Sequence, residues 1–329
     1  MSKARYSESA YLATGRGHMN RRKFITTIAA AGSAMVVRPG LGAEGSAFQF
    51  NCFSKHLQWL DYKETAEVLK DAGYNGVDLT VRPGGHVEPE RVEEDLPRAV
   101  ETFVAAGLNV PMIVTSVTRA DDPSQERTLR TAAALGVKIY RMGYLNYETS
   151  LGIEGSIAQL RPQIKELADF NRQIGITGAY QNHAGTRIGG AVWDLWLLLQ
   201  DVAPQHLGIQ YDIKHATAEG GRSWILGLQL VAEHINCLAL KDFLWQQNDR
   251  GQWSDTPVPM GTGMVDYPAF FAAVKDLNIL VPVTMHLEYK MPHQEFPDAA
   301  HAVKKAKEIE VYRRDLAVAR EMMRKSGLI

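Results

Sequence analysis

The sequence has little cysteine, little excess of charge of either sign and no long apolar run. Its 329 residues include only two cysteines, Cys52 and Cys237, too few for a disulfide framework or a cysteine-rich zinc site. We expect both to be free buried thiols. The longest weakly apolar run, residues 25–37, falls short of the ~20 residues of a membrane-spanning helix, so stable membrane insertion is not expected. With 28 Gly, 14 Pro and 45% hydrophobic residues, the composition is globular rather than disordered or collagen-like.

The formal net charge is −1 at pH 7, but charge is unevenly distributed along the chain. Residues 1–43 hold seven of the 36 basic residues and only one of the 37 acidic residues. The rest of the chain therefore has 29 bases against 36 acids, a net charge of about −7. An acidic body repels phosphate backbones, which argues against general nucleic-acid binding.

The first 43 residues have the order of parts typical of an export signal. Asn20-Arg21-Arg22-Lys23-Phe24-Ile25 places paired arginines before a hydrophobic residue, a weakly apolar run follows, and Leu41-Gly42-Ala43 offers a small-residue cleavage site. This order resembles a twin-arginine signal and predicts an exported or periplasmic protein, with residues 1–43 as signal and leader. Translation could start at Met1 or Met19. A disordered tail is the alternative interpretation.

From residue 44 to residue 329, short apolar runs alternate with amphipathic stretches at helical spacing. Four helical stretches each end at a glycine, a common helix stop, namely Gly73, Gly107, Gly136 and Gly175. The repeat of about 30 residues is the size of a βα unit. The predicted strands are Phe48–Phe53, Gly76–Leu79, Val110–Val114, Lys138–Met142, Thr177–Gln181, Leu207–Asp212, Cys237–Lys241 and Val281–Leu287.

About eight βα units without an internal linker predict an α/β fold, a single-domain (β/α)₈ TIM barrel over residues 44–329. A doubly wound open sheet is the alternative, but no glycine-rich phosphate loop follows the first strand. The segment from about residue 299 to the end predicts a closing helix with a charged, solvated face.

Polar side chains gather at the carboxyl ends of the last four predicted strands. They are Gln181, Asn182 and His183, then Asp212 and His215, then Lys241 and Asp242, and finally His286 and Glu288. The chemistry of a (β/α)₈ barrel lies at that end of its strands. Because buried charge without a partner costs several kcal/mol, the cluster predicts a functional site. Singly, each residue also has a structural interpretation: a hydrogen-bonded core histidine, an Asp242 that caps the next segment, or a Lys241 in an ion pair.

Four motifs, in this order, resemble the sugar phosphate isomerase/epimerase family of xylose isomerase-like barrels, which includes endonuclease IV. They are Q-N-H at 181–183, D-x-x-H at 212–215 followed by two glycines, A-L-K-D at 239–242, and P-M-G-T-G-M-V-D at 259–266 followed by a glutamate on the last strand. The resemblance covers most of residues 48–290. It implies a TIM barrel that acts on a small-molecule carbohydrate.

The resemblance also implies a divalent metal held by Glu, Asp, His and Glu from strands five to eight. The corresponding positions here are Gln181, Asp212, Ala239 and Glu288. Gln181 can still offer a carbonyl oxygen, whereas Ala239 cannot coordinate a metal. The remaining metal ligands, Gln181, Asp212 and Glu288, favour Mn²⁺ or Mg²⁺, and participation of a histidine would also admit Zn²⁺, Co²⁺ or Fe²⁺. A metal-free pocket that kept the fold is the alternative.

The chemistry implied by the resemblance is proton abstraction next to a sugar carbonyl. Family epimerases use two glutamates, and Gln181 cannot act as the second base. Isomerisation and elimination by a lyase or dehydratase on a 3-keto-sugar therefore both remain open, each with one base. We expect Glu288 to be the base, His215 an acid/base or substrate contact, and Lys241 an electrostatic stabiliser. A non-catalytic carbohydrate-binding barrel is a further alternative, and an endonuclease IV-like activity is disfavoured by the acidic body.

Export favours a free sugar, a keto-sugar or a glycoside as substrate, because phosphorylated sugars are mostly cytoplasmic. His183 is expected to orient the substrate. Trp245 and Trp253 flank a polar insertion after the seventh strand and are expected to cover the pocket and stack on sugar rings. Trp193 and Trp196, three residues apart on a predicted helix, are expected in the core. Oligomeric state is open.

Overall fold

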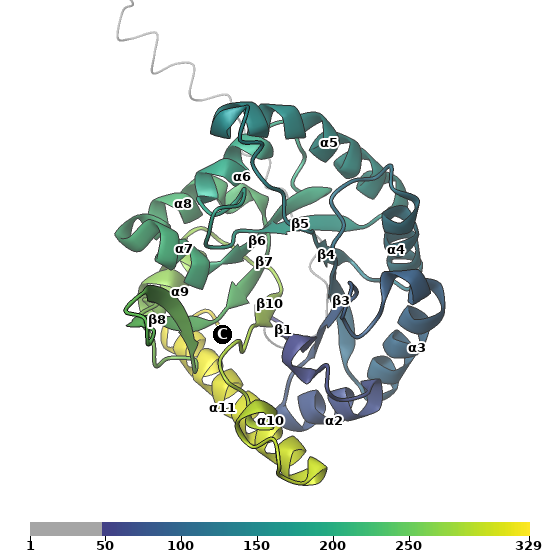
Figure 1. Ribbon diagram of the computed structural model, residues 1–329, viewed down its shortest axis with the longest axis vertical. Helices are drawn as coiled ribbons and strands as arrows, with labels where there is room; N and C mark the ends of the chain where they lie inside the picture. The colour runs from purple at the N-terminus through teal and green to yellow at the C-terminus, as the bar shows by residue number, and fades with distance from the viewer. Residues whose placement is uncertain (1–47) are drawn as a thin grey trace, which may run out of the picture. The chain divides into compact units, whose positions relative to one another are not determined.

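Eight parallel strands close into a barrel in the computed structural model, which describes residues 48–329 (Figure 1). The predicted export signal lies outside the described residues. Around the barrel, neighbouring strands follow the order β1-β10-β7-β6-β5-β4-β3-β2. The strands are β1 (Phe50–Phe53), β2 (Gly76–Thr80), β3 (Asn109–Val114), β4 (Ile139–Arg141), β5 (Thr177–Gln181), β6 (Leu207–Asp212), β7 (Ile235–Leu240) and β10 (Val283–Met285). The predicted (β/α)₈ barrel is confirmed.

Helices form the outer layer of the barrel and connect its strands (Figure 1). Gly73 and Gly175 stop two of them in the left-handed conformation, with φ of 94° and 73°, which glycine adopts without steric cost. The helices are α2 (Tyr62–Ala72), α3 (Val92–Ala105), α4 (Pro123–Ala134), α5 (Gly152–Ile174), α6 (Val192–Leu198), α7 (Ile213–Gly220), α8 (Trp224–Val231), α9 (Tyr267–Asp276), α10 (Pro292–Glu295) and α11 (His301–Lys325). Over residues 48–329, no helix is long and apolar enough to cross a membrane.

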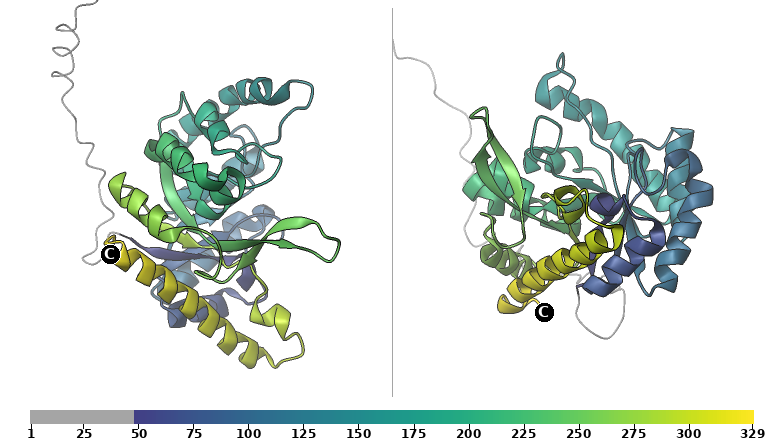
Figure 2. Two further views of the ribbon diagram at one scale, coloured as in Figure 1. Left: turned by 90° about the vertical axis from the view of Figure 1, so that its left-hand side faces the viewer. Right: turned by 60° about the horizontal axis from the view of Figure 1, so that its bottom comes forward.

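The last helix, α11, packs against α2 and α9 on the outside of the barrel, which confirms the predicted closing helix (Figure 2). Its inward face buries apolar side chains such as Tyr312 and also the carboxylates of Glu308 and Asp315, while its other charged residues are at least partly exposed. Inside the barrel wall, Cys52 and Cys237 are buried free thiols, as the sequence predicts.

Two local features differ from the sequence expectation. The polar insertion after β7 is an antiparallel hairpin of β8 (Asp242–Gln247) and β9 (Trp253–Val258), which projects from the barrel (Figure 2). Trp193 and Trp196 are not in the core, because their side chains are 47% and 37% exposed. The short helix α6 instead buries its opposite face, which includes Leu195, so the tryptophan spacing marks the solvent side.

Candidate active site

The carboxyl ends of β5, β6, β7 and β10 bring the predicted site residues together. Gln181 ends β5, Asp212 ends β6, Lys241 directly follows β7, and Glu288 lies three residues beyond β10. Because all four strands are parallel, their carboxyl ends meet at one rim of the barrel. The side chains form one connected set rather than separate polar residues.

A chain of hydrogen bonds and ion pairs runs through this set. Gln181 Nε2 donates to Asp212 Oδ2 at 2.7 Å. The Lys241 ammonium lies 3.1 Å from the same Asp212 oxygen and donates to Glu288 Oε2 at 2.9 Å. Lys241 is 4% exposed and Asp212 is fully buried, so this ion pair is shielded from solvent. The ammonium is thus held between two carboxylates at the centre of the rim.

The close charges favour the ionised forms of the buried Lys241 and of Glu288, whose side chain is 19% exposed. Burial by itself would lower the pKa of Lys241, but the charges of Asp212 and Glu288 outweigh it and raise that pKa. In Glu288, burial opposes ionisation, and the charge of Lys241 more than offsets it, so the pKa of this carboxyl is lowered. At neutral pH the unliganded site therefore holds a lysine cation beside an ionised carboxylate.

Two histidine rings lie close together beside the ion pair, tilted by 34° to each other. The rings of His183 and His215 lie with their centroids 3.8 Å apart. Burial, and next the charge of Lys241, lowers the pKa of both, that of His215 well below its usual value. His183 Nδ1 lies 2.9 Å from the Ala184 carbonyl oxygen, whereas neither ring nitrogen of the buried His215 has a hydrogen-bond partner within residues 48–329. The lowered pKa values favour the neutral form of both rings at neutral pH, in which each ring has one N–H donor and one unprotonated nitrogen.

Asp242 has a structural role, one of the two interpretations that the sequence leaves open. Its carboxylate accepts hydrogen bonds from the backbone N–H groups of Phe243, Gly261, Gly263 and Val265. A Cβ at Gly263 would lie 2.1 Å from Asp242 Oδ1, so the loop requires glycine there. The P-M-G-T-G-M-V-D motif is therefore a loop wrapped around this carboxylate, next to Lys241.

The hairpin carries the two tryptophans that the sequence places over the pocket. Trp245 is 43% exposed and Trp253 is 63% exposed. An ion pair between Lys214 of α7 and Asp255 of β9 ties the hairpin to the barrel rim. The hairpin therefore exposes two tryptophan side chains near the rim, and their contact with a substrate stays a prediction.

The sequence motifs did not point to Arg141 and Tyr144, which contact the oxygen end of the Gln181 amide while Asp212 contacts its nitrogen end. Arg141 Nη1 and the Tyr144 hydroxyl donate to Gln181 Oε1 at 3.0 and 2.7 Å. Arg141 ends β4 and is 5% exposed. The sequence carries a signal for Arg141, because an arginine at the end of a buried strand is as costly to bury as the polar residues that end strands five to eight.

The donor set does not fit the four-ligand metal site that the resemblance implies. Gln181 Oε1 already accepts two hydrogen bonds, one of them from a guanidinium, and Ala239 provides no donor atom. The Lys241 ammonium lies between the two remaining carboxylates, where a divalent ion would meet it as a like charge. Within residues 48–329, no three His, Cys, Asp or Glu side chains converge as a metal-binding group.

Comparison with known proteins identifies the family. A model described as a xylose isomerase-like TIM barrel matches residues 66–321, and the chain belongs to this family. No curated protein matches by sequence.

Solved structures with the same fold include three informative ones, all of low sequence identity. A 3-keto-D-glucoside 4-epimerase from E. coli is 12% identical, with 83% of this chain and 99% of that chain covered and a TM-score of 0.60. A probable 3-DHS dehydratase of petrobactin synthesis from Bacillus anthracis is 13% identical, with 83% and 98% covered and a TM-score of 0.57. The IOLI protein, solved with a bound zinc atom, is 16% identical, with 84% and 98% covered and a TM-score of 0.63.

Proposed function

We propose that this protein is an enzyme of the sugar isomerase/epimerase kind, which removes a proton next to the carbonyl of a small carbohydrate. The single observation that supports this most is the buried Lys241 ammonium held between Asp212 and Glu288 at the carboxyl end of the barrel. The epimerase and the dehydratase among the structures of the same fold are consistent with this class of chemistry.

In the proposed reaction, Glu288 is the base and Lys241 is the electrophile. The substrate C–H bond breaks, its proton moves to the Glu288 carboxylate, and its electron pair passes to the carbonyl oxygen. The Lys241 ammonium donates a hydrogen bond to that oxygen and stabilises the enediolate charge, which makes the C–H group acidic enough for a carboxylate base. Asp212 keeps the ammonium in position from the other side.

The proposed reaction has one base because the opposite position is an amide. Gln181 cannot accept a proton at neutral pH, so a symmetric two-carboxylate epimerisation is disfavoured. His215 is proposed to move the hydroxyl proton of the enediolate, and His183 to orient the substrate. Return of the proton from Glu288 to the adjacent carbon gives isomerisation. In the lyase reaction the carbonyl forms again, the group β to it departs with its bonding electron pair, and that group takes the proton from Glu288. Both outcomes share the first step.

Deuterium exchange tests that first step without knowledge of the product. A panel of ketoses and keto-sugars is incubated with the protein in heavy water and followed by NMR. We expect exchange at the carbon beside the carbonyl, its loss in Glu288→Gln and Lys241→Met, and no effect of a chelator. Binding without exchange would instead indicate a carbohydrate-binding barrel, and exchange abolished by a chelator and restored by Mn²⁺ would assign the chemistry to a metal.

We also propose that the protein is exported by a twin-arginine signal within residues 1–43. The paired Arg21 and Arg22 before a weakly apolar run support this. A reporter fused to these residues is expected in the periplasmic fraction, and Arg21→Lys/Arg22→Lys is expected to retain it in the cytoplasm. Efficient export of the double variant would contradict the assignment.

A further inference from the structure

A second polar region lies on the other side of the same rim, and its charge is all of one sign. A cavity of about 300 Å³ opens beside β2, β3 and β4. Three arginines line it, Arg82, Arg141 and Arg187, together with hydroxyl groups such as those of Thr115 and Ser116. Hereafter this is the arginine pocket.

Two aromatic rings hold the three guanidinium groups near one another. Arg82 and Arg141 lie over the Phe53 ring, 5.6 and 5.4 Å from its centroid. Arg141 and Arg187 lie over the Tyr144 ring, at 5.5 and 5.4 Å. Cation–π contacts orient the guanidinium groups but do not neutralise them.

The chain compensates these charges only in part. Within residues 48–329, none of the three guanidinium groups is within ion-pair distance of a carboxylate, although other arginines such as Arg91 and Arg161 are. Arg141 is 5% exposed, and its Nε has no hydrogen-bond partner in this part of the chain. Asp78 feels the charge of Arg141, but burial raises its pKa to about 7, so at neutral pH it offers only partial compensation.

Gln181 explains why Arg141 has no ion-pair partner at the end of β5. The amide oxygen that receives Arg141 Nη1 at 3.0 Å is neutral, whereas a glutamate in its place would form an ion pair. Gln181, which takes the place of the second base, therefore also leaves the Arg141 guanidinium available to another anion.

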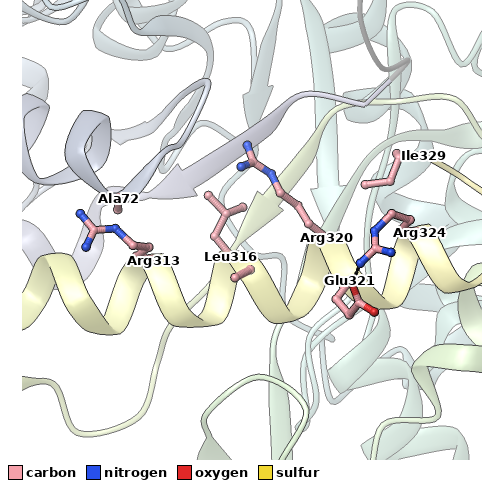
Figure 3. A pocket seen from close by; sticks show the side chains of 8 residues that line it. Ala72, Arg313, Leu316, Arg320, Glu321, Arg324 and Ile329 are labelled. Atoms are coloured by element: carbon pink, nitrogen blue, oxygen red, sulfur yellow. Dashed lines mark ion pairs between the residues drawn. The ribbon is translucent and has the colours of Figure 1, made fainter.

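A second groove shows what arginines with structural partners look like. It has a volume of about 430 Å³, lies between α11 and the end of α2, and also contains three arginines (Figure 3). Arg313 and Arg320 donate to the backbone carbonyls of Asp71 and Gly73, and Arg324 pairs with Glu321. The packing of α11 accounts for these arginines. In the arginine pocket, by contrast, the guanidinium groups of Arg82 and Arg187 lie over aromatic rings and donate no hydrogen bond within residues 48–329.

We propose that the substrate is a carbohydrate with an oxyanion group and that the arginine pocket binds this group. The proposed export favours a carboxylate, and a phosphate is the alternative that the binding test distinguishes. Guanidinium forks match both oxyanions with paired hydrogen bonds. Gln181 joins the pocket to Asp212 and Lys241 through its two ends, so a monosaccharide with its anionic end at Arg141 would place its carbon chain toward Glu288. This inference rests on the proposed function and adds the substrate class.

Direct binding measurements separate this inference from catalysis. D-glucuronate, D-glucose 6-phosphate and D-glucose are titrated calorimetrically into the full mature protein. We expect at least one of the two anionic sugars to bind more tightly than glucose by about tenfold or more, the strength of a charge-assisted hydrogen bond. The stronger of the two identifies the oxyanion. Equal affinity for all three sugars would overturn the proposal, even if deuterium exchange occurs.

Variants assign the binding to the pocket. Arg187→Ala changes an exposed side chain and is expected to lower the affinity for the anionic sugar by about tenfold or more without altering the fold. Gln181→Glu is expected to lower this affinity similarly, because a carboxylate then forms an ion pair with Arg141. Arg320→Ala, in the groove at α11, is the matched control and should bind normally. Unchanged affinity in both pocket variants would overturn the proposal, whereas failed exchange with intact anion binding would overturn only the proposed function.

Discussion

Lys241 and Arg141 are both buried cations at the carboxyl end of the barrel, but their charges are balanced differently. Lys241 has two carboxylate partners, Asp212 and Glu288, while Arg141 has the neutral amide of Gln181 and two aromatic rings. A cation between fixed carboxylates suits chemistry, since its position is held while charge develops on a substrate. An uncompensated cation suits binding, because the substrate itself supplies the missing charge. We therefore infer different tasks for the two halves of the rim.

The largest effect is expected from Lys241→Met, which leaves Asp212 and Glu288 without their cation. Breaking a buried ion pair from one side costs about 3–5 kcal/mol of unfolding free energy, and exchange activity should be lost with it. Urea unfolding measures the change in unfolding free energy. Lys241→Met/Glu288→Gln removes one of the two carboxylates and should recover part of the stability. A single variant within about 0.5 kcal/mol of wild type would show that the pair is not buried as described.

A smaller loss is expected from Asp242→Ala, which acts beside Lys241 rather than on it. The variant leaves the loop N–H groups of Gly261, Gly263 and Val265 without their acceptor, at a cost of about 2 kcal/mol. Asp242→Asn retains one acceptor oxygen and should lose less. Anion binding in the arginine pocket should be unchanged in both, and loss of that binding would mean that the two halves are not independent.

The arginine pocket should bind added anions, whereas the site around Lys241, with its two carboxylates, should not. A saturating oxyanion such as inorganic phosphate is expected to raise the unfolding free energy of wild type by about 1 kcal/mol or more, through linkage to binding. In Arg187→Ala the gain should shrink, while Arg320→Ala should keep it. Equal stabilisation of all three proteins would point to a general salt effect.

The smallest effect on folding is expected at the hairpin. Trp253→Ala changes a side chain that is 63% exposed, so the unfolding free energy should stay within about 0.5 kcal/mol of wild type. If the tryptophan stacks on a bound sugar, its removal raises KM severalfold and leaves kcat nearly unchanged. An unaltered KM would remove Trp253 from the substrate contacts.

The barrel was predictable because its signals are local and repeated. Helix stops such as Gly73 and Gly175, followed by short apolar strands, define each βα unit without knowledge of long-range contacts. The hairpin was not predictable by the same means, since β9 is polar, contains Pro257 and pairs only with β8. Trp193 and Trp196 were misplaced because a helix spacing of three identifies a face but not which side is buried.

The site was predictable in part, for an equally physical reason. Asp212, Lys241 and Glu288 follow strands whose order is clear in the sequence, so their meeting at one rim follows from the fold. The sequence does not show which cation neutralises the carboxylates of Asp212 and Glu288. Nor does it show that Arg82 and Arg187, from loops far apart in the chain, lie over the same rings as Arg141.

The most direct test of the role assigned to Lys241 is the metal content of mature protein purified without chelators. Elemental mass spectrometry should find well under one divalent ion per wild-type chain, because Ala239 has no donor and Lys241 lies between the carboxylates. Gln181→Glu/Ala239→His, which supplies the missing donors, should gain metal and serves as the positive control. About one ion per wild-type chain, lost in Asp212→Asn, would contradict the assignment of the site's positive charge to Lys241.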